Sequence, residues 1–507
     1  MAKIWKLNFL ILIFIAYLNF PAFAENQILN KKTPEGIFSN AVVKVFVTKN
    51  EMDYYRPWQS KGIAASSGSG AIIKGNRILT NAHVVSDHTF IQVKKDADPK
   101  KYSARVVAVG YDCDLALLSV EDPDFFKGTT ALEFGELPKQ QDSVTVVGYP
   151  EGGGKISITE GVVSRIEVTA YTQSSRQLLT VQIDAAINAG NSGGPVIQNG
   201  KLVGIAMQVF LAAQNIGYMI PTPIIDHFLN DLDDGTYNGF PTLGIDYKNT
   251  ENATMRKFYG IDKMEGGVLI AKVLPYSPAS GNLQEGDILM NINNVLIGED
   301  GTFPFRGEER LSLTHLITDK HIGDTIDLVI IRDGQGQNIK LRLEPFVTLV
   351  PQPNYFEKPP YYIFGGLVFT VLSMDLIYSW GDMWWEKAPL DLAYYAIGTG
   401  RLNEQKRKEI VVLLDVLPDD INVGYHDFGK DVVTKVNGRE IKSFRDLVTV
   451  INEEKKNEKY TIIETEHASR IILDNNGIEE INSEILKRNS IPYQYSDDVA
   501  GWINGAN

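Results

Sequence analysis

Three polar residues in the first part of the chain have the side chains that serine-based hydrolysis needs. His83 lies in ILTNAHVV, Asp114 in DCDLALLSV and Ser192 in GNSGGP. A serine hydroxyl is a weak nucleophile, so it requires a base that titrates near neutrality. A carboxylate beside that base fixes its tautomer and favours the imidazolium. The pattern predicts Ser192 as nucleophile, His83 as general base and Asp114 as the acid that orients it.

Each of these residues also has a purely structural interpretation. A histidine at a strand end is commonly a packing residue, an aspartate before a strand commonly forms a turn, and Gly-Ser-Gly is a common loop. Only His83 and His88 occur before residue 200, so the choice of base is narrow. The order His, Asp, Ser at successive strand ends favours the catalytic interpretation.

The glycines around Ser192 predict a site for a developing oxyanion. Glycine permits a tight turn that turns several backbone N–H groups to one side. We expect the N–H groups of Gly190, Asn191 and Ser192 to face the oxyanion of a tetrahedral intermediate, where each fixed donor lowers the barrier.

Residues 190–194 also satisfy the Gly-x-Ser-x-Gly pattern of a nucleophile elbow, which suggests an α/β-hydrolase as an alternative. That motif requires a strand before the serine and a helix after it. Here Pro195 follows, and two short β-branched runs are then joined by Asn199-Gly200. No helix begins there, so the elbow interpretation is rejected.

The elements that must position these residues are strands. From residue 36 to about 225, short β-branched runs alternate with Gly, Asn and Asp turns, which is typical of a sandwich or a pair of barrels. KGNR (74–77) and QNGK (198–201) predict hairpin turns. PTPIIDHFLNDLDDG predicts a short helix after the last of these strands.

Beyond residue 240 the pattern changes to a mixed α+β module that is repeated. Val-Leu-Pro occurs at 273–275 and again at 416–418, and the two copies are offset by 143 to 144 residues. Residues 351–360 read as an extended linker. The apolar stretch 361–380 predicts a buried strand followed by a turn of helix, with a membrane-inserted segment as the alternative.

Composition excludes several classes of function. The 507 residues carry a net charge of −14, which argues against nucleic acid or an anionic membrane surface as partner. A single cysteine, Cys113, excludes an intramolecular disulfide. The glycine-rich stretch 148–157 lacks the Lys-Ser/Thr of a phosphate loop, and no histidines or cysteines have metal-ligand spacing. We therefore expect no metal and no cofactor.

The N-terminus has the three parts of a secretory signal. Lys3 and Lys6 precede an apolar run, and AFA at 22–24 has small residues at both positions that define cleavage. We predict cleavage after Ala24 and a periplasmic protein without a stable membrane span. An uncleaved anchor is the alternative.

TNAHVV, DLALL and GNSGGP in this order resemble the Deg/HtrA serine proteases. The resemblance implies a mainly β chain: signal peptide (1–24), trypsin-like double β-barrel protease domain (34–232), PDZ domain (240–346), linker (347–360) and divergent PDZ-like domain with a C-terminal extension (361–507). The tail motifs FRGEER, KPPYYIFGGLVFT and INVGY look most like plant-type Deg proteases, which are organellar or nuclear. Here an export signal stands in front instead.

The same resemblance implies roles for particular residues. His83, Asp114 and Ser192 match the family's charge-relay residues, and Gly190 and Asn191 match its oxyanion turn. Ile187 and Leu211 fall where the family forms a small apolar pocket for the residue before the cleaved bond. The TLGI motif falls where a PDZ domain binds a peptide carboxylate. Its expected binding residues are Leu243, Gly244 and Ile245.

The family also implies a homo-oligomer built from trimers, ATP-independent action and binding of unfolded polypeptides or hydrophobic C-terminal peptides. The second module departs from the first, because Lys430 replaces the glycine at Gly286. Three functions remain open: an exported endopeptidase for unfolded proteins, a peptide-binding chaperone with a latent triad, and a scaffold that uses only its PDZ-like modules.

Overall fold

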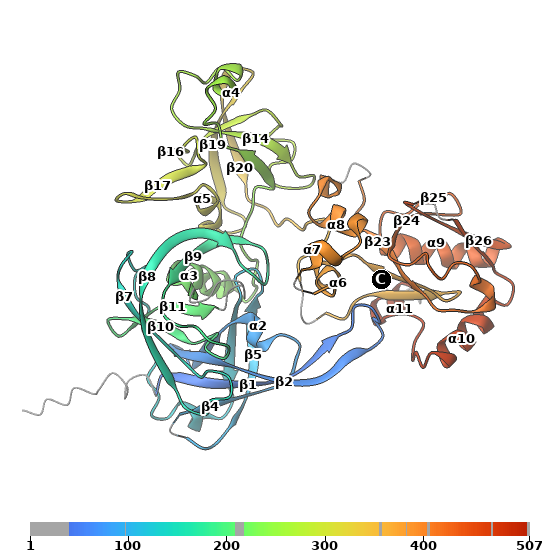
Figure 1. The fold of residues 1–507 in the computed structure, drawn as a ribbon, viewed down its shortest axis with the longest axis horizontal. Helices are drawn as coiled ribbons and strands as arrows, with labels where there is room; N and C mark the ends of the chain where they lie inside the picture. The colour runs from blue at the N-terminus through green and yellow to red at the C-terminus, as the bar shows by residue number, and fades with distance from the viewer. Residues whose placement is uncertain are drawn as a thin grey trace, which may run out of the picture.

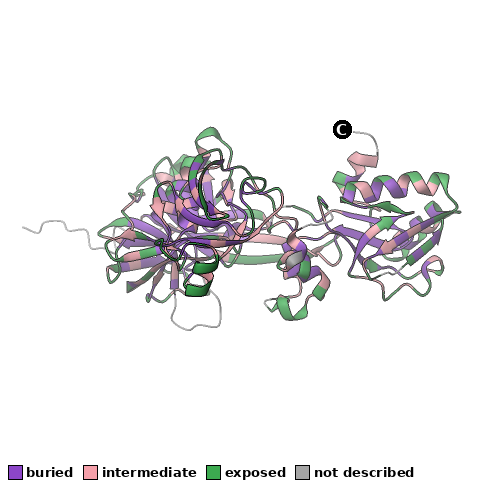
Figure 2. Ribbon diagram, turned by 90° about the horizontal axis from the view of Figure 1, so that it is seen from above, coloured by how far each residue is buried: buried purple, intermediate pink, exposed green. Residues whose placement is uncertain are grey.

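The structure is a computed structural model that describes residues 40–503, except 97, 208–216, 354–356, 382, 403–405 and 468–469. The predicted signal peptide lies outside the described residues. Three units follow one another along the chain, and the first consists of two β-barrels (Figure 1). Buried residues concentrate on the strands of these units, and exposed residues lie mainly on helices and loops (Figure 2).

The first barrel closes in the order β1-β2-β3-β6-β5-β4. Its strands have the β-branched and small residues that suit a curved sheet, and the inward residues of β1 are almost all buried. A one-turn helix, α2 (Ala82–Val85), and a 3-10 turn, η1 (Pro123–Phe126), interrupt the strand sequence. The strands are β1 (Val42–Met52), β2 (Ser60–Ile73), β3 (Arg77–Thr80), β4 (His88–Lys95), β5 (Tyr102–Gly110) and β6 (Leu115–Val120).

The second barrel closes in the order β10-β11-β12-β9-β8-β7, so the predicted mainly β, trypsin-like double barrel is confirmed. Helix α3 (Thr222–Asp231) and η2 (Leu232–Asp234) follow its last strand, as the sequence predicts. The strands are β7 (Ser143–Gly148), β8 (Ser157–Ala170), β9 (Gln177–Ile183), β10 (Pro195–Gln198), β11 (Lys201–Met207) and β12 (Gly217–Pro221).

The first PDZ-like unit is a sheet in the order β13-β14-β15-β19-β20, with β16 paired to β15 and a separate β17–β18 hairpin. Strand β13 lies at one edge of this sheet. The elements are β13 (Ile245–Lys248), α4 (Ala253–Phe258), β14 (Val268–Val273), β15 (Ile288–Ile292), β16 (Val295–Leu296), β17 (Thr302–Arg306), β18 (Glu309–Ser312), α5 (Thr314–Thr318), β19 (Thr325–Arg332) and β20 (Gln335–Arg342).

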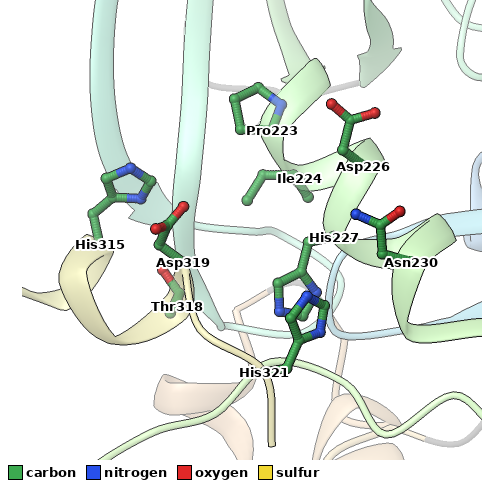
Figure 3. A pocket seen from close by; sticks show the side chains of 9 residues that line it. All are labelled: Pro223, Ile224, Asp226, His227, Asn230, His315, Thr318, Asp319 and His321. Atoms are coloured by element: carbon green, nitrogen blue, oxygen red, sulfur yellow. The ribbon is translucent and has the colours of Figure 1, made fainter. Parts of the chain in front are cut away.

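Aromatic rings join the protease unit to the first PDZ-like unit. The imidazole of His227 on α3 stacks between Phe240 and His321, with centroid distances of 3.9 and 4.0 Å. Its Nε2 lies 2.9 Å from the carbonyl oxygen of Lys320. A cavity of about 230 Å³ opens beside this stack between α3 and the α5 region (Figure 3).

The second PDZ-like unit has the sheet order β21-β22-β23-β24-β26-β27, with β25 paired to β24. Short helices form an insertion between β22 and β23. The elements are β21 (Tyr361–Phe364), β22 (Leu367–Val371), α6 (Met374–Tyr378), α7 (Trp384–Lys387), α8 (Leu390–Ala396), η3 (Thr399–Leu402), β23 (Val411–Val416), η4 (Asp420–Asn422), β24 (Asp431–Val436), β25 (Arg439–Glu440), α9 (Phe444–Asn457), β26 (Tyr460–Thr465), β27 (Arg470–Asp474), α10 (Ile478–Arg488) and α11 (Asp497–Ile503).

The apolar stretch 361–380 forms two buried strands and a short helix, close to the prediction. Within the described part of the chain, no helix has the length and apolar character needed to cross a bilayer.

A long hairpin of the first barrel reaches the second PDZ-like unit. Strands β1 and β2 extend beyond the barrel wall, and their tip lies beside the C-terminal unit (Figure 1). The Tyr55 ring meets Trp380 edge-on at 5.2 Å, and the Trp58 ring meets Tyr361 at 6.1 Å. The hairpin tip thus packs against the apolar core of that unit.

Candidate active site

His83 lies on helix α2, one turn long, rather than at the end of a strand as the sequence analysis expected. The chain leaves β3 at Thr80 and turns into this helix at once. The Nζ of Lys49 on β1 donates to the His83 carbonyl at 2.9 Å and to Ser86 Oγ at 3.0 Å. Burial lowers the pKa of Lys49. This ammonium stabilises the carbonyl end of the helix that holds the imidazole.

Asp114 fixes the imidazole from the other side. Its carboxylate is fully buried, and its two oxygens lie 3.0 and 2.8 Å from His83 Nδ1. The same carboxylate accepts the backbone N–H of His83 at 2.9 Å. The Asp114 carbonyl accepts from Ala82 N at 3.1 Å and from Asn81 Nδ2 at 3.0 Å. Ring and carboxylate are therefore held together by both main chain and side chain.

Ser192 lies in the turn between β9 and β10, at the junction of the two barrels. Its side chain is 3% exposed, and its Oγ has no hydrogen-bond partner among the described residues. A Cβ built on Gly68 would lie 2.7 Å from Val84 Cγ1 and 3.2 Å from the Ser192 carbonyl oxygen. The turn that carries Ser192 and the helix that carries His83 thus both lie against strand β2 of the first barrel.

The turn before Ser192 is held by its main chain. The Ala189 carbonyl accepts from Glu151 N at 2.6 Å, and Asn191 N donates to the Asn188 carbonyl at 2.9 Å. This corrects the expectation for Asn191, because its N–H is used within the turn. The N–H groups of Gly190 and Ser192 have no partner in the described part of the chain.

The residues expected to line the substrate pocket are only partly visible. Ile187 is half-buried and packs on the core of the second barrel. A Cβ on Gly217 of β12 would come within 2.8 Å of Ile187 Cδ1, so the strand passes close to this side chain. Leu211 lies outside the described residues.

The TLGI segment lies at a separate cavity of about 440 Å³ in the first PDZ-like unit. Leu243, Gly244 and Ile245 line it together with α5 and with Arg176 of the protease unit. Ile245 begins the edge strand β13, which is bonded to β14 on its other side. Gly244 has φ of +72°, and a Cβ there would collide with Ser277. The three predicted residues are thus brought together beside an open strand edge.

Sequence reasoning missed how the catalytic region is tied to the first PDZ-like unit. Asp112 Oδ1 accepts the Tyr237 hydroxyl at 2.5 Å, and its Oδ2 accepts Phe240 N at 2.9 Å. Both partners lie between α3 and β13. The intervening Cys113 is buried, and burial raises the pKa of its thiol. Asp112 is two residues before Asp114, but nothing local signals a partner that is more than a hundred residues away.

Comparison with known proteins agrees with this architecture. A trypsin-like peptidase domain matches residues 68–205 and a PDZ domain matches residues 350–498. Protease Do-like 2, chloroplastic, from Arabidopsis thaliana is 42% identical over 472 residues, covering 92% of this chain and 76% of its own. Protease Do-like 4, mitochondrial, from the same plant is 39% identical over 454 residues, covering 89% and 84%. Among solved structures, HtrA-type protease AlgW with tripeptide is 24% identical with a TM-score of 0.48, covering 61% of this chain and 94% of its own.

Proposed function

This chain belongs to the Do-like (Deg/HtrA) family of serine endopeptidases with PDZ domains, and on that premise we propose that His83, Asp114 and Ser192 are its catalytic triad. The observation that carries the proposal is the buried Asp114 carboxylate, 2.8 Å from Nδ1 of a partly exposed imidazole. With Nδ1–H donated to Asp114, His83 Nε2 keeps its lone pair for the serine proton.

In the proposed reaction Ser192 Oγ attacks the peptide carbonyl as His83 takes its proton. The oxyanion is stabilised by the N–H groups of Gly190 and Ser192, and His83 then protonates the leaving amine. A water molecule then attacks the acyl-enzyme as His83 takes its proton, and the acid product leaves as His83 returns a proton to Ser192 Oγ. No step draws on ATP, in line with the proposed ATP-independent action. We assign Ile187 and, on the family resemblance alone, Leu211 to binding of the residue before the cleaved bond, which favours cleavage after small aliphatic residues.

We assign peptide binding to the first PDZ-like unit. A peptide adds as a strand to the free edge of β13, its carboxylate beside Gly244 and its last side chain between Leu243 and α5. Hydrophobic C-termini suit this cavity, and such termini are exposed when proteins unfold. The proposed substrates are therefore unfolded polypeptides, handled by a homo-oligomer of trimers.

One observation favours a latent form as a second candidate. No hydrogen bond joins Ser192 Oγ to another described residue, so the nucleophile and the base are not engaged. Catalytic hydrogen bonds often tighten only when substrate binds. A chain held in this form would act as a peptide-binding chaperone or scaffold.

Degradation of casein by residues 25–507 tests the proposal. We expect Ser192→Ala and His83→Gln to reduce kcat by about 10⁴-fold or more. His88→Gln is the matched control, because His88 is the other histidine of the first barrel, and it should retain activity. If Ser192→Ala cleaves like the wild type, the proposed triad is wrong. If neither cleaves but both suppress aggregation, the chaperone is favoured.

Export is a separate part of the proposal. The relatives compared above are named chloroplastic and mitochondrial, whereas this N-terminus reads as a bacterial export signal. N-terminal sequencing of the protein from a periplasmic extract should begin at Glu25. A chain that begins at Met1 in the cytoplasmic fraction contradicts this assignment.

A further inference from the structure

Ser69 connects the two barrels at the turn that precedes the proposed nucleophile. It lies on β2 of the first barrel and is fully buried. Its Oγ donates to the Gly190 carbonyl at 2.7 Å and accepts Tyr149 N at 2.8 Å. Its backbone N–H donates to the Ser192 carbonyl at 2.9 Å. One residue of the first barrel thus holds three main-chain groups of the second.

The contact depends on glycines that let the two segments approach. Gly193 has φ of +83°, and a Cβ there would collide with the Ser69 carbonyl oxygen and Thr80 Oγ1. A Cβ on Gly148 would lie 2.9 Å from Ser69 Oγ. Thr80 Oγ1 in turn donates to the Ser69 carbonyl at 2.7 Å. The hydroxyl is therefore enclosed in a tightly packed site with a fixed direction.

Ser69 holds the peptides on both sides of the one that carries the Ser192 N–H. A peptide unit is planar, so fixing its C=O also fixes its N–H. Ser69 Oγ fixes the 190–191 peptide, whose Asn191 N–H is bonded to the Asn188 carbonyl. Ser69 N fixes the Ser192 carbonyl and with it the 192–193 peptide. The Ser192 N–H belongs to the 191–192 peptide between these two, so holding both neighbours keeps that N–H from turning away from a bound oxyanion.

We propose that Ser69 is a positioning residue for peptide hydrolysis, which keeps the Ser192 N–H directed at the oxyanion. The inference rests on the proposed role of Ser192. Ser69 touches no reacting atom, so its effect is confined to the transition state and its analogues. Ground-state binding of a peptide in the substrate pocket does not depend on it.

The test compares Ser69→Ala with Thr180→Val in the full mature chain. Thr180 on β9 is 1% exposed, and its Oγ1 donates to the Leu178 carbonyl at 3.1 Å, so this control removes a buried hydroxyl that does not contact the turn. The measurements are kcat, KM, the affinity for a peptide aldehyde and the affinity for the matching product peptide. An aldehyde forms a tetrahedral adduct that needs the oxyanion donors, whereas the product peptide does not.

We expect Ser69→Ala to lower kcat and aldehyde affinity by about 10- to 100-fold, because loss of a direct donor costs about 10²- to 10³-fold and this effect is indirect. KM and product affinity should stay within about 2-fold. Thr180→Val should keep wild-type kcat. Equal losses in aldehyde and product affinity, or an unchanged kcat in Ser69→Ala, would overturn the inference.

A third variant keeps the test decisive if Ser69→Ala folds poorly. Ser69→Cys fills the site but donates weakly, so kcat should fall even though the packing is retained. A Ser69→Cys variant with wild-type kcat shows that packing alone is needed and contradicts the inference. Absence of Ser192-dependent activity in the wild type would instead contradict the proposed function.

Discussion

The two PDZ-like units share the same elements, but they differ in what lies along one strand edge. In the first, the Gly244 carbonyl accepts Leu274 N at 2.8 Å, and in the second the Gly366 carbonyl accepts Leu417 N at 2.7 Å. These leucines belong to the repeated Val-Leu-Pro, so β13 corresponds to β22. The free edge of β13 borders a cavity, whereas the same edge of β22 pairs with β21.

The second unit thus fills with its own chain the place that the first leaves open. Tyr362 and Phe364 of β21 belong to one apolar cluster with residues of α9. The Gly365 N–H, at the position that corresponds to Leu243, donates to Asn482 Oδ1 at 2.7 Å. The same groove is therefore filled by the chain itself in the second unit and open in the first, where we propose that it binds peptide.

The largest expected effect comes from emptying the filled groove. Phe364 is fully buried, so Phe364→Ala should lower the unfolding free energy of the second unit by about 3–5 kcal/mol. Five of the six tryptophans lie in or beside this unit, namely 58, 380, 384, 385 and 502, so tryptophan fluorescence during urea unfolding reports it.

Leu243→Ala at the open groove is the control for this comparison. It should weaken binding of a hydrophobic C-terminal peptide and leave the tryptophan transition in place. If Phe364→Ala leaves that transition unchanged, β21 does not stabilise the unit and the comparison fails.

The next effect concerns the glycine at the open groove. Gly244→Val forces a β-branched residue into left-handed backbone and against Ser277, which should reduce peptide affinity by about 2–3 kcal/mol, or about 30- to 150-fold. Fluorescence anisotropy of a labelled peptide measures the loss. Gly366→Val should instead unfold the second unit without changing peptide affinity, and an equal affinity loss in both variants would show that both grooves bind.

A smaller effect is expected where the first unit is tied to the protease. Tyr237→Phe removes the hydroxyl bonded to Asp112 and should lower stability by about 1–2 kcal/mol, because a buried acceptor loses its partner. We also expect a hydrophobic C-terminal peptide to stimulate casein cleavage by the wild type. This stimulation should weaken in Tyr237→Phe, because the contact joins the segment before β13 to the segment before Asp114. If peptide stimulates Tyr237→Phe as much as the wild type, the hydrogen bond between Tyr237 and Asp112 does not couple peptide binding to cleavage.

The smallest expected effect is a pH dependence of stability that distinguishes the second unit from the first. Asp287 is paired with Arg332 at 2.6 Å, and its counterpart Asp431 is paired with His467 at 2.9 Å. The hydrogen bond to Asp431 raises the pKa of His467 above 6.5. A raised histidine pKa gives stability that is fully present below pH 6.5 and is lost as pH rises through the folded-state value.

The Tm of the second unit should therefore fall in the wild type as the pH rises above 6.5, over the range in which His467 loses its proton. In His467→Arg the cation is permanent, as it is at Arg332, and the Tm should be flat across this range. Thermal melts followed by tryptophan fluorescence measure both. A wild-type Tm that does not change over the range would contradict the role of this pair.

The sequence predicted the fold well where the signal was local. His83, Asp114 and Ser192 each lie in a short motif, and the order of these motifs is typical of the double barrel that the structure contains. Their catalytic roles stay a prediction. The helix around His83 was missed, because a one-turn helix of Ala, His and Val has no periodic pattern. The Asn191 N–H was misassigned, since a turn's internal bonds are set by its dihedral angles.

The sequence did not predict contacts between segments that are far apart along the chain. Ser69 and Gly190 are 121 residues apart, and only the glycines on either side of Ser69 hint at a close approach. Strand β21 was predicted as buried, but its place in a peptide groove depends on how sheet and helix pack. The sequence analysis made no prediction for the aromatic residues at 54–58, because their partners lie in the last unit.

The hairpin tip also bears on the order in which the chain is made. Trp58 leaves the ribosome about 300 residues before its partner Tyr361, which is about 15–60 s at 5–20 residues per second. During that interval the barrels can close while Tyr55 and Trp58 remain uncovered. We expect the nascent protease to expose an aromatic tip until synthesis reaches the last unit, so truncated products should be recognisable to chaperones by that tip.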